Sequence, residues 1–255
     1  MKRMFIEGRG LWTPGFATPD AWLDGEADET VVKPLVDIVA SRMKRATSLM
    51  TRTAVEIVTQ AGREAEWELD SFATAFGSTH GEIQIAVEQM VMMQEGSGVV
   101  SPARFKNSVH NTAAGLFSIA AKNKGFTTAI AAGPHTFAMS LLEAWGLLAT
   151  GEVDRIVVSV TEETLPEPIA SFSDHLALGA AVALTRERTP RTLGSLGPPS
   201  RGNANAPVID SRWNGHTAEG LLRIFRALAD GYRGNVGCSE GWVTHVEPAS
   251  QVEAA

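Results

Sequence analysis

Apolar positions along the chain follow two patterns, a spacing of three to four residues and short continuous runs. The helical spacing marks one buried face in the segments 35–61, 83–95, 111–121 and 217–230. Between these segments lie short runs of apolar or β-branched residues, which favour strands. These runs are residues 3–8, 71–76, 126–131, 155–160, 176–184 and 242–246. Helices that alternate with strands predict an α/β fold, with a mixed, largely parallel sheet packed by helices.

The stretch from residue 132 to residue 163 is the clearest unit of this pattern. Pro134 suits the first turn of a helix, and Gly151 suits the position just after its last turn. A β-branched strand follows at residues 155–160. With the strand at 126–131 before it, the stretch predicts a strand-helix-strand unit whose two strands run parallel.

Glycine, proline and asparagine become frequent after about residue 190. We therefore predict a main domain over residues 1–190 and a loop-rich C-terminal extension over residues 191–255. The extension is expected to carry one helix and one short strand and to pack on the same domain. Near the other end of the chain, Gly8 and Gly10 are expected to end the first strand and begin a loop.

The composition is that of a globular protein, with 255 residues, of which 44% are hydrophobic. The net charge is -7, and the basic residues are dispersed except for a short cluster at residues 42–45, so we expect no nucleic acid partner. No apolar run is long enough for a signal peptide or a membrane span, which predicts a cytoplasmic protein. The single cysteine, Cys238, excludes an internal disulfide and a multi-thiolate metal site. We expect no metal or cofactor, and an inert, buried Cys238 thiol.

Five segments, taken in order and at their spacing, carry a resemblance to a known family. They are MFIEGRGLWTPG, SRMKRATSLMTRTAVEIVTQAG, FGSTHGE, SPARFKNSVHNTAAGLFSIAAKNKG and LLEAWGLLATGEVDRIVVSVTEE. They resemble the N-terminal domain of the β-ketoacyl synthases, members of the thiolase superfamily, and cover residues 1 to about 185. The resemblance implies a thiolase-like α/β half, and it makes the main domain a ketosynthase-like domain.

The chain departs from this family where the family carries its nucleophile. Ketosynthases hold a cysteine at a helix N-terminus, where the dipole and the free amides stabilise a thiolate. In this sequence the position falls on Pro134, which has neither a nucleophilic side chain nor the backbone N–H needed for an oxyanion hole. We therefore predict no independent catalysis. The residues of this degenerate nucleophile turn are Ala132, Gly133, Pro134, His135 and Thr136.

The departure makes the chain similar to the shortened, chain-length-factor-like proteins of type II fatty acid and polyketide systems, such as those of aryl polyene synthesis. By this resemblance, the helix that starts at Ile83 lies near the floor of an acyl pocket at a dimer interface. Plain core packing is the alternative for Ile83 and Val87, and core packing is expected for the methionines at 90, 92 and 93. The candidate pocket or interface residues are His80, Ile83, Gln84, Val87, His110 and Asn111.

His135 has two interpretations, a residual base or a residue that begins the helix and faces a partner. The second is favoured, because a base without a nucleophile beside it does little. His110 and Asn111 are expected to fix a turn by hydrogen bonds. Glu162 and Glu163 follow one another on a strand and therefore point to opposite faces, so they cannot flank one substrate bond.

Three functions remain open from the sequence. The first is a non-catalytic subunit that pairs with an active ketosynthase, shapes its acyl pocket and helps to dock acyl carrier protein. The second is an acyltransferase or thioesterase of the same superfamily with a relocated nucleophile, for which the candidates are Cys238, Thr136 and Ser140. The third is a stand-alone homodimer that binds an acyl group or a carrier protein.

Overall fold

The computed structural model describes residues 2–45, 47–96, 101–173, 175–204 and 207–249. Its strands are β1 (Met4–Trp12), β2 (Ala73–Gly77), β3 (Thr127–Ile130), β4 (Arg155–Glu162), β5 (Leu178–Thr185), β6 (Gly194–Leu196), β7 (Ser200–Arg201), β8 (Gly234–Ser239) and β9 (Trp242–Pro248). Its helices are α1 (Pro19–Asp24), α2 (Ser41–Lys44), α3 (Leu49–Glu64), α4 (Ile83–Gln94), α5 (Pro102–Lys106), α6 (Thr112–Ala121), α7 (Thr136–Thr150) and α8 (Glu219–Ala229). Short 3₁₀ turns lie at Gly133–His135, Glu167–Phe172 and Ser211–Trp213. The α/β alternation expected from the sequence is confirmed.

One mixed sheet runs through the molecule in the order β3-β2-β4-β5-β1-β6-β9-β7. Strand β8 belongs to the same sheet and pairs with β9, outside this order. Only β2 with β3 and β2 with β4 pair in parallel among the described strands; the other pairs are antiparallel. The expectation of a mixed sheet is confirmed, but the expectation of a largely parallel one is wrong. Helices connect β2, β3 and β4, which keeps these strands parallel. The connection from β4 to β5 is a loop with a 3₁₀ turn, and β8 joins β9 by a short turn, so both pairs are antiparallel.

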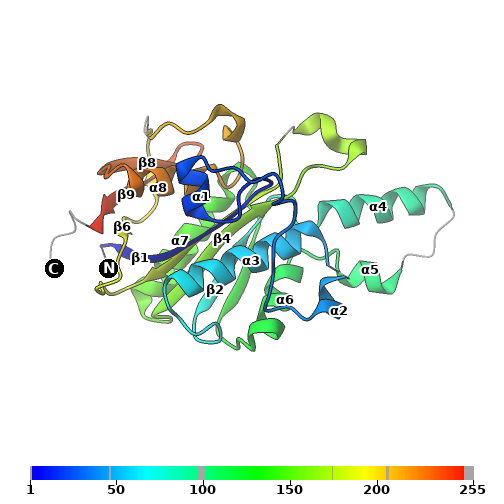
Figure 1. Cartoon of the computed structure of the whole chain (residues 1–255), viewed down its shortest axis with the longest axis horizontal. Helices are drawn as coiled ribbons and strands as arrows, with labels where there is room; N and C mark the ends of the chain where they lie inside the picture. The colour runs from blue at the N-terminus through cyan, green and yellow to red at the C-terminus, as the bar shows by residue number, and fades with distance from the viewer. Residues whose placement is uncertain (1, 46, 97–100, 174, 205–206, 250–255) are drawn as a thin grey trace.

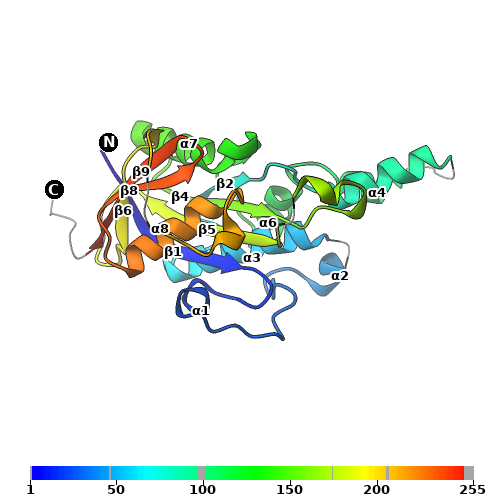
Figure 2. The ribbon, with the colours of Figure 1, turned by 90° about the horizontal axis from the view of Figure 1, so that it is seen from above.

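Helices cover both faces of the sheet, and each face has its own core. On one face, α3 and α6 pack over aromatic residues that include Phe72, Phe76 and Phe117. On the other face, α7 and α8 pack over β-branched residues of β4 and over alternate residues of β5, which include Val182 and Leu184. Figure 1 shows α3 lying across the strands, and Figure 2 shows α7 on the opposite side of the sheet from α3.

Gly8 and Gly10 lie inside β1 and do not end it, which corrects the prediction from sequence. A Cβ atom at Gly10 would lie 2.1 Å from the carbonyl oxygen of Ile57, and one at Gly8 would lie 2.1 Å from that of Ala61. Both oxygens belong to α3, so the helix backbone rests directly on the strand. Glycine is needed at these two positions because nothing larger fits under α3.

The segment 35–61 does not form one helix as expected. A short helix, α2, is followed by a break, and α3 then begins after Ser48, whose side-chain oxygen accepts a 2.9 Å hydrogen bond from the amide of Thr51. Val36 has a φ of 48°, which no regular helix allows. Ala46, which the apolar spacing placed on the same face, lies outside the described residues.

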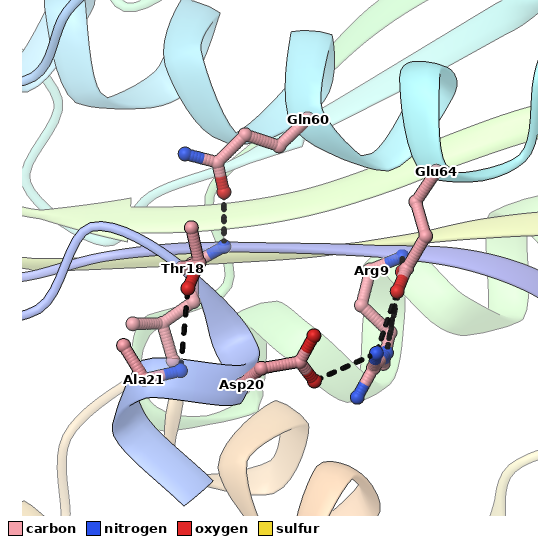
Figure 3. A network of polar contacts seen from close by, with 7 residues as sticks. Arg9, Thr18, Asp20, Ala21, Gln60 and Glu64 are labelled. Carbon is pink, nitrogen blue, oxygen red and sulfur yellow. Dashed lines mark hydrogen bonds and ion pairs between the residues drawn. The ribbon is translucent and has the colours of Figure 1, made fainter. Parts of the chain in front are cut away.

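Polar contacts tie β1 to α3 and α1 at the edge of this packing (Figure 3). The Arg9 guanidinium donates to Glu64 and, at 3.0 Å, to Asp20. The Gln60 side chain accepts a 3.0 Å hydrogen bond from the amide of Leu11, and Thr18 caps α1. These bonds satisfy backbone and charged groups that the bare contact between helix and strand would leave without partners.

The segment after residue 190 holds more regular structure than one helix and one short strand. It contributes β6, β7, β8 and β9 as well as α8, and β6 extends the main sheet by pairing with β1. The short strands were missed because Gly194, Gly234 and Gly237 interrupt their apolar pattern. Helix α8 buries Leu221, Phe225 and their neighbours against the sheet, as its helical spacing predicts.

Helix α4 projects away from the body of the molecule, as both views show (Figures 1 and 2). Gln89 is its one buried residue among those described, and Met90 and Met93 are 64% and 61% exposed. The expectation that the methionines fill the core is therefore wrong. Apolar spacing shows that a helix has an apolar face, but it does not show what covers that face. Within the described residues, no helix has the length and apolar character that crossing a bilayer requires.

Candidate functional site

The carboxyl ends of β2, β3 and β4 meet at one edge of the sheet, as expected for neighbouring parallel strands. Glu162, the last residue of β4, accepts hydrogen bonds from the Ser78 hydroxyl at 3.1 Å, the His80 amide at 3.4 Å and the Thr79 amide. Burial raises the pKa of this carboxyl, and the three donors oppose that rise. Glu162 therefore holds the turn after β2 against the end of β4.

The turn after β3 is the place where the sequence predicts a degenerate nucleophile. Residues Gly133–His135 form a 3₁₀ turn that leads into α7, with Gly133 at a φ of 56° and Pro134 exposed. The Thr136 hydroxyl donates to the Gly133 carbonyl at 2.8 Å and accepts from the Ala132 amide at 3.0 Å. Pro134 thus lies at the N-terminus of α7, with no side chain or N–H to offer a substrate.

Three hydroxyl groups from distant parts of the chain gather beside this turn. Thr79 Oγ1 lies 3.0 Å from the Gly133 carbonyl oxygen, 3.3 Å from Thr136 Oγ1 and 3.1 Å from Thr217 Oγ1. Thr79 follows β2 and Thr217 precedes α8, so the cluster joins both halves of the chain at the Pro134 turn. The hydroxyl groups of this cluster bond to the turn and to one another, so we assign the cluster a structural role.

A cavity of about 420 Å³ opens next to Pro134. Its far side is made of the C-terminal segment, with His216, Cys238, Ser239 and Trp242 among the lining residues. The Ser239 hydroxyl lies 3.2 Å from the amide of Ala138 in the first turn of α7 and accepts from it. The C-terminal strands therefore supply the cap that the start of α7 lacks in its own sequence.

The nucleophiles considered for a relocated active site are all unsuited to that role. Burial raises the pKa of the Cys238 thiol to about 12, so it stays protonated at neutral pH. The Ser140 hydroxyl donates to the Thr136 carbonyl at 2.8 Å, and the Thr136 hydroxyl is held by the turn as described. Within the described residues, none of the three makes a hydrogen bond to a histidine or carboxylate side chain.

His216 is buried and close to Cys238 along the cavity wall, but it is not a competent base. Burial and the neighbouring His175 lower the pKa of its imidazole to about 3. Its Nδ1 accepts a 3.0 Å hydrogen bond from the amide of Ala218, which uses the ring nitrogen that a base would need. The imidazole is therefore neutral and serves to fix the loop before α8.

We expect Cys238 in the folded chain to resist alkylation by iodoacetamide at pH 8, because the thiol is 1% exposed and protonated. In guanidinium chloride the same thiol should react fully. Mass spectrometry of timed samples measures both rates. Rapid alkylation of the native protein would contradict the assignment of Cys238 as a structural thiol.

The candidate pocket residues do not line the cavity at Pro134. His80 is exposed in the turn after β2, whereas Ile83, Gln84 and Val87 are half-buried at the start of α4. His110 Nε2 lies 2.8 Å from the Ser78 carbonyl oxygen, so His110 braces that turn. Asn111 is exposed and lines a separate cavity of about 320 Å³ beside α6. The structure thus brings His80, Ile83 and His110 together around the root of α4, in the turn that Thr79 joins to the Gly133 carbonyl.

His135, at the junction between the 3₁₀ turn and α7, makes no side-chain capping bond. Its Nδ1 is buried and has no hydrogen-bond partner in the described structure. Among the described residues, no group of three or more histidine, cysteine or acidic side chains is arranged to hold a metal ion. Sequence reasoning missed Thr79, His216 and Ser239. Each lies beside a glycine-rich turn, but no local spacing connects the three.

The sequence matches the family model described as beta-ketoacyl synthase, N-terminal domain, over residues 20–222. A comparison with curated protein sequences found no match. Several solved structures share the fold.

One is a ketosynthase, ApeO, in complex with its chain length factor, ApeC, from Xenorhabdus doucetiae. It has a TM-score of 0.72 and 17% identity, over 97% of this chain and 100% of that chain. Another is the ishigamide ketosynthase/chain length factor, with a TM-score of 0.63 and 16% identity, over 89% of this chain and 74% of that chain. A third, AntDE:AntF, is a type II polyketide synthase acyl carrier protein in complex with its ketosynthase, with a TM-score of 0.62 and 14% identity, over 80% and 69% of the two chains.

At these identities the structures show a shared fold, the thiolase-like arrangement of a mixed sheet packed by helices. The family model covers most of the chain, from α1 into α8, and includes the strand-helix-strand unit around Pro134. The chain therefore belongs to the β-ketoacyl synthase N-terminal domain family.

Proposed function

We propose that this chain is a non-catalytic, chain-length-factor-like subunit that pairs with an active β-ketoacyl-ACP synthase and shapes its acyl pocket in fatty acid or polyketide biosynthesis. The observation that carries the proposal is Pro134, which occupies the N-terminus of α7 where the family resemblance places the nucleophilic cysteine. The turn around Pro134 keeps its hydrogen bonds, which supports a domain that retains the fold but lacks the nucleophile.

An open sheet edge supplies a surface on which such a subunit can pair. Strand β3 is the end strand of the sheet, and the elements on both sides of it expose apolar side chains. Ile119 on α6 is 67% exposed, Phe126 just before β3 is 37% exposed, and Leu142 on α7 is 36% exposed. An uncovered edge strand with apolar neighbours favours pairing with another chain. We propose that the partner ketosynthase adds its own strand here.

The exposed apolar face of α4 supports a second contact with the same partner. Ile83 and Val87 at its root remain the candidate pocket and interface residues, together with His80, Gln84, His110 and Asn111. We propose that this group reaches the acyl pocket of the complex and limits the length of the chain made there. The third solved structure pairs a ketosynthase with an acyl carrier protein, and we propose a carrier protein as a further partner of the complex, in the cytoplasm.

The test is to coexpress this chain with a tagged, cysteine-bearing ketosynthase encoded beside it and to follow both by size exclusion and by a condensation assay. We expect one complex, whose condensation activity survives Pro134→Ala and His135→Ala but falls about tenfold or more when the subunit is omitted. Replacing the nucleophilic cysteine of the ketosynthase serves as the control and should abolish activity. Solitary elution together with thioester turnover by this chain alone would overturn the proposal.

A further inference from the structure

Helix α4 joins the body of the molecule through its N-terminal root, the residues around Glu82, and then extends outward (Figure 2). Further along it contacts α5, where Arg104 pairs with Glu88, an ion pair between exposed side chains that contributes little. Beyond that root, Gln89 is its one buried residue among those described. The direction in which α4 points therefore depends on how its root is held. Gly81, just before the root, has a φ of 60°, so the chain turns sharply there on a residue that tolerates this backbone.

Three buried carboxyl groups surround this root. Glu82 is the residue before α4, makes no side-chain capping bond and is 2% exposed. Glu163 follows β4 and is 7% exposed, and Glu162 ends β4 and is 6% exposed. Glu163 Oε1 accepts a hydrogen bond from the amide of Gln84 in the first turn of α4, at 3.3 Å. The Gln84 side chain donates to the carbonyl of Thr164 at 2.7 Å. Through these two hydrogen bonds, Glu163 and Thr164 hold the first turn of α4 against the end of β4.

The charges around Glu163 do not balance when all three carboxyl groups are ionised. Glu82 and Glu162 both face Glu163, and the Oε2 atom of Glu82 is buried without a hydrogen-bond partner. The other titratable groups facing the cluster are His80, opposite Glu162, and His110, opposite Glu82. The groups of α3 and its cap that contact the cluster, Ser48, Met50 and Thr51, carry no charge. Among the described residues, no lysine or arginine acts on any of the three carboxyl groups.

Burial raises the pKa of all three carboxyl groups, and the pKa of Glu163 reaches about 7. For Glu163, burial is the largest cause, the amide of Gln84 opposes it, and the negative charge of Glu82 adds to it. A raised carboxyl pKa means that the closed root binds a proton that an open, hydrated root gives up. Closure is therefore favoured at low pH and is weakened as the pH rises through about 7.

We propose that the cluster Glu82, Glu162 and Glu163 is a proton-controlled hinge, which fixes the projecting helix α4 while Glu163 is protonated and loosens it when Glu163 ionises. On ionisation, the Glu163 carboxylate faces two buried acids and no paired cation, so solvation by water becomes the alternative to the closed contact. Water enters at the root, and the first turn of α4 separates from the end of β4. The helix then carries its exposed methionines in a range of directions instead of one.

The hinge is a property of the isolated chain and does not depend on any partner. Hydrogen exchange measured by mass spectrometry on the full chain at pH 6 and pH 8, corrected for the intrinsic rate, tests it. The wild-type peptide that carries the first turn of α4 should lose about tenfold in protection between the two values. One pH unit below a pKa of about 7, the protonated form of the closed root outweighs the ionised form about tenfold, and at pH 8 this advantage is gone.

Glu163→Gln keeps the acceptor for the Gln84 amide but cannot ionise, so its α4 peptide should stay equally protected at both pH values. Glu152→Gln, which alters an exposed acid far from the root, is the matched control and should behave as the wild type. If Glu163→Gln does not fold, Glu82→Gln answers the same question. Removing the facing charge should lower the pKa of Glu163, so the loss of protection should move to lower pH and α4 should be less protected at pH 6 than in the wild type. Constant protection in the wild type, or an equal loss in Glu163→Gln, would overturn the hinge.

Discussion

Replacing Ala129 by proline is expected to weaken pairing with the proposed ketosynthase partner about 100-fold while the isolated chain stays folded. The amide of Thr74 on β2 donates to the carbonyl of Phe126, just before β3, and the amide of Ser78, just after β2, donates to the carbonyl of Ile130 on β3. The backbone groups of Phe126 and Ile130 therefore face β2. Backbone groups alternate along a strand, so those of Thr127 and Ala129 face the open edge. Proline at 129 therefore removes a hydrogen-bond donor that only a partner strand would use.

The expected loss of affinity is roughly 100-fold, because losing one inter-strand bond and displacing its neighbours costs about 2–3 kcal/mol. Analytical size exclusion and titration calorimetry of the purified chain against the ketosynthase measure it. Thr128→Pro is the matched comparison. It removes an inward donor and should unfold the β2–β3 pair, which circular dichroism would detect. Ala129→Val should pair normally. Unchanged affinity for Ala129→Pro in a folded chain would exclude β3 as the pairing edge.

Replacing Gly10 by alanine should destabilise the chain by roughly 3 kcal/mol, the upper end of the usual cost of core overpacking. The added Cβ would lie 2.1 Å from the Ile57 carbonyl oxygen, and the obstacle is helix backbone, not a side chain that can turn aside. To make room, α3 must lift from β1, which exposes the aromatic core beneath it and separates Leu11 from Gln60.

Denaturant unfolding followed by circular dichroism measures this change as a lower midpoint. Gly115→Ala is the matched control, because a Cβ there meets nothing within 4 Å and the residue lies in an exposed part of α6. That variant should be stabilised by up to about 1 kcal/mol, since alanine is the better helix former. Equal midpoints for Gly10→Ala and the wild type would show that α3 does not rest on β1 as described.

The sequence by itself determined the features that depend on neighbouring residues. The spacing of apolar residues and the stop at Gly151 placed α7 and β4 within a few residues, because local sterics and capping decide where a helix ends. The sequence also determined that Pro134 cannot itself act as a nucleophile, because its side chain carries no reactive group whatever surrounds it. The family followed from the same local segments, and the sequence match over residues 20–222 confirms it.

Only the tertiary structure decided what depends on contacts between distant residues. From the sequence, Gly8 and Gly10 are predicted to be turn residues, but α3 packs directly on them. The methionine-rich helix α4 is predicted to lie in the core, but its apolar face is exposed. The meeting of Thr79 with Thr217, and of Glu82 with Glu163, joins residues that no sequence period connects. The physical reason is that periodicity records which side of an element is apolar, whereas the element that packs on that side is chosen by the whole chain.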